Sequence, residues 1–184
     1  MSKAILRTFI AYVEDLPGVL NRVTSLLRRR NYNIVSLTVG RTERAGTSRM
    51  TIVLEADDDG ARRIEANLYK LVNVLWVQDT SHAATMVREL ALIKVRADGA
   101  KRGEVMGLCD VFRARVVDVG PEALVAEITG TGDKIDGLVE VLQPFGIVEM
   151  VRTGAVAMVR SAEATDADRM PLSSRPPPGD ARAA

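Results

Sequence analysis

The stretch YVEDLPGVLNRV, from Tyr12 to Val23, joins a β-rich segment to a helical one. Upstream, Ile5 to Val13 is rich in β-branched and aromatic residues, which is typical of a strand. Downstream, Pro17 to Arg30 has apolar residues at helical spacing, with Val19, Val23, Leu26 and Leu27 on one face. Asp15 is predicted to cap this helix. The stretch is therefore predicted to be a strand-to-helix turn that positions a helix start.

The segments that follow alternate between strand and helix patterns. Tyr32 to Thr42 and Thr47 to Glu55 flank the turn ERAG, which predicts a β-hairpin. Asp57 to Leu71 begins with three acids suited to a helix N-terminus and continues with helical periodicity. Asn73 to Thr80 then resembles a closing strand. The predicted order is β-α-β-β-α-β, which is the order of a ferredoxin-like unit.

The same order recurs between Arg88 and Arg160, as a repeat of pattern rather than of residue identity. Strands are predicted at 88–97, 115–119, 122–130 and 146–160, and helices at 101–114 and 133–145. The predicted fold class is therefore α+β, with two ferredoxin-like βαββαβ domains, each a four-stranded antiparallel sheet with two helices on one face. The domains are placed at 4–79 and 87–160, with a linker at 80–86 and a disordered, proline-rich tail at 161–184.

Composition limits the classes of partner. The 184 residues include 25 lysines and arginines against 24 aspartates and glutamates, so the overall charge favours neither a nucleic acid nor an anionic membrane. The chain has no run of 18 apolar residues and no signal-peptide pattern at its start. It is expected to be soluble and cytoplasmic.

No group of residues predicts a catalytic or metal site. Cys109 lies on an apolar helix face, where a buried inert thiol is expected, and His82 is expected to be a solvated linker residue. TGTGDK, at 129–134, is only a weak nucleotide-site candidate. The acids at 57–59 and the arginines at 28–30 match the charges of the helix ends beside them. The alternatives are an acid/base or metal site for the acids and an anion site for the arginines. Catalytic residues, bound metal and bound cofactor are all predicted to be absent.

The helix start at Gly18 predicts a binding site. The backbone N–H groups of Gly18, Val19 and Leu20 should be free of intrahelical partners, and glycine lets a ligand approach closely. Asp15 offers an acceptor for an ammonium group a few ångströms away. A carboxylate and an ammonium on one small molecule suit an amino acid.

Three motifs resemble an ACT domain, specifically that of the regulatory (small) subunit of acetolactate synthase. They are DLPGVL at Asp15–Leu20, RNYNIVSLTVG at Arg30–Gly40 and SRMTIVL at Ser48–Leu54. The segment from Val111 to Arg160 is similar to the C-terminal domain of the same family. The resemblance covers Ile5 to Arg160 and leaves out only the tail.

The resemblance implies a regulatory subunit without an active site of its own. In that family the small subunit binds a large catalytic subunit, which uses thiamine diphosphate, Mg²⁺ and FAD to condense two pyruvates, or pyruvate with 2-oxobutyrate. This reaction begins valine, leucine and isoleucine biosynthesis. The small subunit raises the activity and makes it sensitive to feedback inhibition by valine. No cofactor is expected on this chain.

The resemblance also implies an effector site shared between two chains. Gly18 and Val19 of one protomer and Asn33 and Ile34 of its partner would enclose one valine in a homodimer of ACT domains. Asp15 stands where the family often has asparagine, and a carboxylate cannot donate a hydrogen bond as an amide can. Two alternatives stay open: a free-standing amino-acid-binding ACT regulator, and a small enzyme acting through an unidentified surface.

Overall fold

The computed structural model describes residues 4–160. The chain forms two compact units. The first unit comprises the chain up to Met86 together with the chain from Ala157, and the second comprises Val87–Val156. The tail predicted to be disordered, 161–184, lies outside the described residues.

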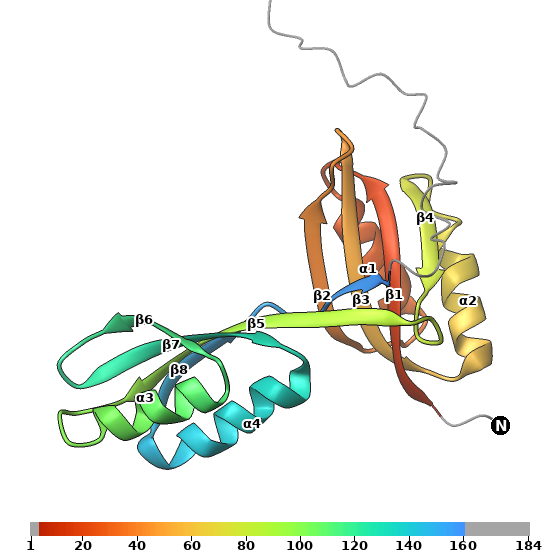
Figure 1. Cartoon of the computed structure of the whole chain (residues 1–184). Helices are drawn as coiled ribbons and strands as arrows, with labels where there is room; N and C mark the ends of the chain where they lie inside the picture. The colour runs from red at the N-terminus through yellow and green to blue at the C-terminus, as the bar shows by residue number, and fades with distance from the viewer. Residues whose placement is uncertain (1–3, 161–184) are drawn as a thin grey trace, which may run out of the picture. The chain divides into compact units, whose positions relative to one another are not determined.

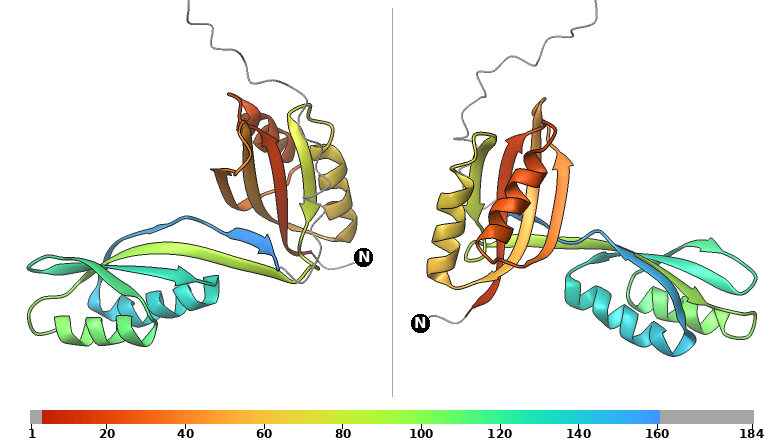
Figure 2. Two further views of the ribbon diagram at one scale, coloured as in Figure 1. Left: turned by 45° about the horizontal axis from the view of Figure 1, so that its top comes forward. Right: turned by 180° about the vertical axis from the view of Figure 1, so that it is seen from behind.

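The first unit has the predicted β-α-β-β-α-β order. Its elements are β1 (Ile5–Glu14), α1 (Val19–Arg29), β2 (Ile34–Arg41), β3 (Thr47–Ala56), α2 (Asp58–Leu68) and β4 (Val74–Asp79). The strand order is β2-β3-β1-β4, and every adjacent pair is antiparallel. Both helices cover the same face of the sheet (Figures 1 and 2). The fold is ferredoxin-like, and β2 is an edge strand of the sheet.

Alternation in the strands and helical spacing in α1 build the core of the first unit. Phe9 and Ala11 on β1 and Ile52 on β3 are fully buried, and so are Val23 and Leu27 on α1. Side chains two residues apart share one face of a strand, whereas side chains three or four apart share one face of a helix. The apolar face predicted for α1 is therefore confirmed.

A buried arginine ties the end of β4 to β1 and α2. Arg7 is 2% exposed, and its guanidinium forms ion pairs with Asp58 and, at 3.3 Å, with Asp79. It also donates to the Nε2 atom of His82 at 2.6 Å and to the Ala56 carbonyl at 3.4 Å. The imidazole of His82 is 70% exposed, as predicted, but it also contributes to this network. Each donor nitrogen of Arg7 has a partner, which makes burial of the charge tolerable.

Glu65 on α2 gives a pH-dependent stability prediction. Burial, and then the charge of Asp79, raise the pKa of Glu65 above its ordinary value of 4.5. The folded protein therefore holds this proton to higher pH than the unfolded chain does, so the ionised carboxylate lowers the free energy of unfolding at neutral pH.

We expect Glu65→Gln to raise the free energy of unfolding at pH 7 by less than about 1 kcal/mol. The gain should shrink as the pH falls below about 4.5, the ordinary pKa of the group, because the carboxyl group then becomes protonated in both states. Urea unfolding at pH 7 and pH 4 measures this difference. Glu55→Gln, at an exposed position on β3, is the control and should have no effect at either pH. A larger gain at pH 4 would contradict the prediction.

The second unit repeats the order and extends its sheet. Its elements are β5 (Thr85–Arg96, the first two residues of which belong to the first unit), α3 (Arg102–Val111), β6 (Arg115–Val119), β7 (Ala123–Gly130), α4 (Gly132–Leu142), the 3₁₀ turn η1 (Gln143–Phe145), β8 (Ile147–Arg152) and the first residue of β9 (Val156–Val159). The predicted four strands have the order β6-β7-β5-β8, and α3 and α4 lie on one face (Figure 2). The structure adds a fifth strand, β9, which also pairs with β5.

β9 can pair with β5 because β5 is much longer than β8. β5 has 12 residues, whereas β8 has six and pairs only with Ala91–Val95. The chain turns at Gly154, which has a φ of +80° that favours glycine, and continues as β9. From Ala157 the chain belongs to the first unit, where the Arg49 guanidinium donates to the Ala157 carbonyl.

Cys109 packs in the core of the second unit. Its thiol is fully buried on α3, in one cluster with Ile93, Val105 and Leu138. Burial, and then the charge of Asp110, raise the pKa of the thiol. A raised pKa keeps the sulfur in its unreactive neutral form, so the predicted packing role is confirmed.

Candidate functional site

The start of α1 is built differently from the prediction. The helix begins at Val19, two residues later than expected, and its N-cap is Gly18 with a φ of +84°. This left-handed conformation favours glycine, and no side chain caps the helix. The prediction that Asp15 is the cap is wrong. A turn through Leu16 and Pro17 separates Asp15 from the helix, and its carboxylate lies 3.5 Å from the Arg41 guanidinium instead.

Two of the three predicted backbone donors are unpaired. The Val19 N–H donates to the Leu16 carbonyl at 3.3 Å, so this group is not free as predicted. Within residues 4–160, the N–H groups of Gly18 and Leu20 have no hydrogen-bond partner. A Cβ atom at Gly18 would have no neighbouring atom within 4 Å, so there is open space beside these donors. The helix start can therefore accept an anionic group.

A polar network that the sequence analysis missed fixes this helix start. Arg22 on α1 donates to the side-chain oxygen of Asn73, and the Asn73 amide donates to the Glu14 carboxylate. Asn73 is 7% exposed and lies between α2 and β4. The network holds the end of β1 and the first turns of α1 against one loop. No sequence pattern signals it, because Glu14 and Asn73 are 59 residues apart.

Asn33 and Ile34 lie at the other end of α1. Asn33 is exposed just before β2, and Ile34 is half-buried as its first residue. The Tyr32 N–H donates to the Leu27 carbonyl, which holds this segment against the last turn of α1. Asn33 and Ile34 line an open pocket of about 450 Å³ together with Tyr32 and four residues of α1, which are Asn21, Thr24, Ser25 and Arg28.

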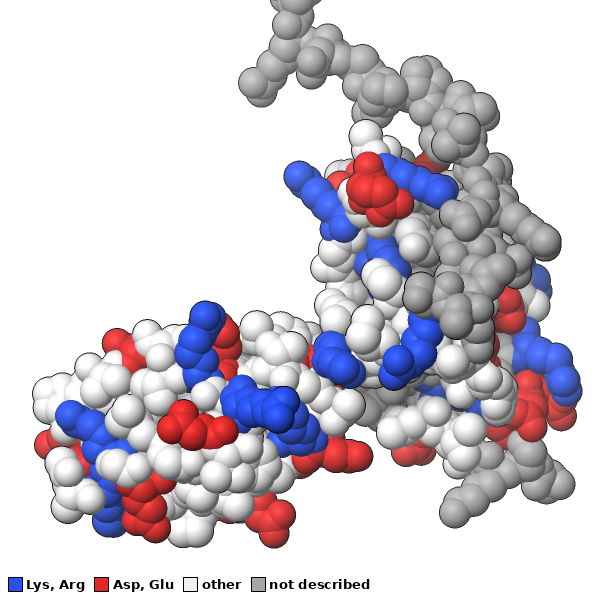
Figure 3. Space-filling view, in the orientation of Figure 1, with Lys and Arg blue, Asp and Glu red and all other residues white. Residues whose placement is uncertain are grey.

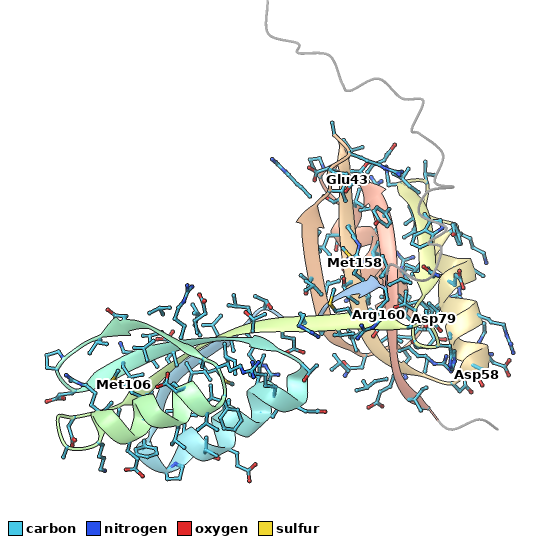
Figure 4. The ribbon with its side chains drawn as sticks, in the orientation of Figure 1. Glu43, Asp58, Asp79, Met106, Met158 and Arg160 are labelled. Atoms are coloured by element: carbon cyan, nitrogen blue, oxygen red, sulfur yellow. The ribbon has the colours of Figure 1, made fainter. Side chains whose placement is uncertain are left out.

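The six predicted site residues therefore form two groups within one chain. Asp15, Gly18, Val19 and Leu20 lie at the start of α1, and Asn33 and Ile34 lie beyond its end. α1, which has 11 residues and is about 16 Å long at 1.5 Å per residue, lies between the two groups. Figure 4 labels Glu43, in the β2–β3 turn, and Asp58, at the opposite end of the first unit. One chain alone does not bring the two groups around one small molecule.

The surface charge and the helices show no sign of a nucleic-acid, metal or membrane site in the part of the chain that the structure describes. On the face shown in Figure 3, basic and acidic side chains are interspersed over both units. Among residues 4–160, no three histidine, cysteine or acidic side chains are grouped closely enough to hold a metal ion. The same part of the chain contains no helix with the length and apolar character needed to cross a membrane.

Comparison with known proteins connects this geometry to one family. Residues 9–76 match the family model described as the AHAS small subunit-like ACT domain, and residues 88–161 match the model described as the small subunit of acetolactate synthase. The acetolactate synthase small subunit of Mycolicibacterium smegmatis is 47% identical over 153 residues, which cover 83% of this chain and 90% of that protein. The chain belongs to the acetolactate synthase small-subunit family.

Other members of the small-subunit family agree with this assignment. The acetolactate synthase small subunit of Mycobacterium leprae is 46% identical, with 83% of this chain and 90% of that protein covered. The crystal structure of the acetolactate synthase small subunit from Thermotoga maritima is 37% identical, with a TM-score of 0.80 over 85% of this chain and 98% of that chain. The first unit therefore contains an ACT domain, and the second contains the domain that characterises the small subunits.

Proposed function

We propose that this chain is the non-catalytic regulatory subunit of an acetolactate synthase, which activates a large catalytic subunit and confers feedback inhibition by valine. The proposal rests on one observation: within one chain, the predicted site residues form two groups, one at each end of α1. Unpaired donors lie at one end of α1, and an asparagine beside a pocket lies at the other end. Two chains are needed to unite them.

Pairing between β2 strands would unite the two groups. β2 is an edge strand, and among residues 4–160 β3 is its only partner. In antiparallel pairing about a two-fold axis, the start of each β2 lies near the end of the other. Asn33 precedes the start of β2, whereas Asp15 lies beside Arg41 at its end. A homodimer formed through β2 would therefore bring Asn33 of one chain towards the helix start of the other.

The polar groups that the two chains would contribute complement an α-amino acid. The Gly18 and Leu20 N–H groups, at the positive end of the helix dipole, would bind the carboxylate of valine. The Asp15 carboxylate of the same chain would accept from the ammonium group. The other chain would contribute the Asn33 amide and an apolar contact from half-buried Ile34.

The proposal assigns the formation of acetolactate to the large subunit and not to this chain. In this proposal the large subunit holds thiamine diphosphate, Mg²⁺ and FAD and condenses pyruvate to 2-acetolactate for valine, leucine and isoleucine synthesis. Membership of the small-subunit family supports this division of roles. The residues of this chain would act only by binding the large subunit and the effector.

Reconstitution tests the proposed function. Acetolactate formation by the large subunit of the same organism should rise when the chain is added, and valine should then reduce the rate in a saturable way. The large subunit alone should respond much less to valine. Valine binding without stimulation of a large subunit would instead identify a free-standing ACT regulator. Acetolactate formation by the chain alone would show that it is an enzyme.

Asn33→Ala is expected to weaken valine inhibition and leave activation intact. The change removes an amide that donates and accepts hydrogen bonds, at a cost of about 1–3 kcal/mol or roughly ten- to a hundredfold in affinity. Asn33 is exposed in the single chain, so its removal should not affect the core. A valine titration of the reconstituted enzyme measures the shift, and the rate without valine is the internal control. An unchanged valine response would exclude Asn33 from the site.

A further inference from the structure

The pocket beside the start of β2 contains one charged residue. Seven residues line it: Asn21, Thr24, Ser25, Arg28, Tyr32, Asn33 and Ile34. Arg28 is the only one of these with a formal charge. The pocket therefore combines hydroxyl and amide groups with a single guanidinium.

The Arg28 guanidinium is available to a ligand. Within residues 4–160 it has no carboxylate within 4 Å and no side-chain hydrogen bond. The Arg28 carbonyl accepts from the N–H of Asn31, whose φ of +60° turns the chain towards β2. This turn places Asn33 at the same pocket as Arg28. The neighbouring arginine, Arg29, is exposed at the same helix end but does not line the pocket.

We infer that Arg28 binds the carboxylate of the amino-acid effector. The inference rests on the proposed two-chain site and adds a residue to it. When β2 strands pair, the helix start of one chain approaches the pocket of the other, so Asp15 and Arg28 come from opposite chains. Asp15 then faces the ammonium group of the effector and Arg28 faces its carboxylate. A guanidinium can form two parallel hydrogen bonds with a carboxylate, which few other side chains can do.

This arrangement also bears on the aspartate at position 15, whose carboxylate already pairs with the Arg41 guanidinium of its own chain. A carboxylate there cannot donate to the effector and would repel the carboxylate of valine. Arg28 supplies both a donor and a positive charge on the opposite side of the same small volume. A carboxylate has two oxygens and several acceptor positions, so Arg28 and the helix-start N–H groups can bind it together.

The test compares four full-length chains by calorimetry: wild type, Arg28→Gln, Arg28→Lys and Arg29→Gln. Arg28→Gln should weaken valine binding at least tenfold. Arg28→Lys should recover part of that loss, because it keeps the charge but not the paired hydrogen bonds. Arg29→Gln removes an adjacent charge from the same helix end and should leave valine affinity within about twofold of wild type.

Valinamide, which lacks the ionised carboxylate, identifies the group that Arg28 contacts. Wild type should bind valine much more tightly than valinamide, and Arg28→Gln should lose most of this preference. A residue that only supports the fold would weaken both ligands equally, which would overturn the inference.

Three other outcomes separate this inference from the proposed function. If Asn33→Ala weakens valine binding but Arg28→Gln does not, the inference is wrong and the proposed site stands. If the wild-type chain binds no valine, both fail. If Arg28→Gln dissociates the dimer without valine, Arg28 pairs with the partner chain and does not bind the effector.

Discussion

Gly18→Asp is expected to abolish the response of the reconstituted enzyme to valine. The new carboxylate would share the site with the carboxylate of valine. Two like charges about 4 Å apart repel by about 4 kcal/mol at an effective dielectric near 20, or roughly a thousandfold in affinity. A Cβ atom at Gly18 meets no atom within 4 Å, so the first atom of the new side chain causes no clash. Activation without valine should persist, because the change alters no core contact.

Gly18→Asn is the matched control for this experiment. The φ of +84° at Gly18 strains any other residue, but asparagine and aspartate tolerate the left-handed region better than most. The two side chains have nearly the same size, so the difference between the variants isolates the charge. Valine titrations of both variants, with urea unfolding as a check on folding, measure it. If both variants lose the valine response equally, backbone strain at position 18 is the cause. If Gly18→Asp keeps the wild-type valine response, the effector binds elsewhere.

Mixed dimers of Gly18→Asp and Asn33→Ala chains are expected to recover half of the valine sites. In a homodimer of either variant, both valine sites carry the same single substitution. In a mixed dimer, Gly18 of one chain and Asn33 of the other form one intact site, and the second site carries both defects. The expectation follows from the places of Gly18 and Asn33 before the start and after the end of α1, a helix about 16 Å long.

Differently tagged chains, purified through both tags, allow this measurement by calorimetry. The mixed dimer should bind valine with near-wild-type affinity at about half the wild-type stoichiometry. Wild-type dimers carrying the same two tags are the control. If the mixed dimer binds no better than either homodimer, the site does not combine Gly18 and Asn33 from different chains, and the proposed geometry is wrong.

The sequence alone determined the order of elements and most of the core. Helical spacing predicted that Val23 and Leu27 face inward, and both are fully buried. The same spacing placed Cys109 in the core of the second unit. The aspartates at the start of α2 were predicted to suit a helix N-terminus, and the N-cap Asp57 accepts from the Gly60 N–H at 2.7 Å. These predictions were correct because each depends on residues within four positions of one another, where backbone geometry determines which side chains are neighbours.

The helix start at Gly18 is the position where local sequence was misleading. Aspartate before proline and glycine is a typical cap sequence, but Asp15 turns towards Arg41 and Gly46 on the β2–β3 hairpin. Its N–H donates to the Gly46 carbonyl at 2.8 Å, a contact that only sheet pairing brings into reach. The left-handed Gly18 then starts the helix without a side-chain cap.

Only the tertiary structure decided which distant residues meet. Arg7 is an ordinary strand arginine in sequence, yet it is buried because β4 returns Asp79 beside it from 72 positions away. Arg28 follows the expected pattern of a solvated helix end, and the pocket beside Asn33 appears only when the turn at Asn31 brings β2 back along α1. Local propensity determines each helix and strand, but strand order and register determine which side chains become neighbours. The unpaired N–H groups at the start of α1, the pocket beside Asn33 and the edge position of β2 all depend on that order.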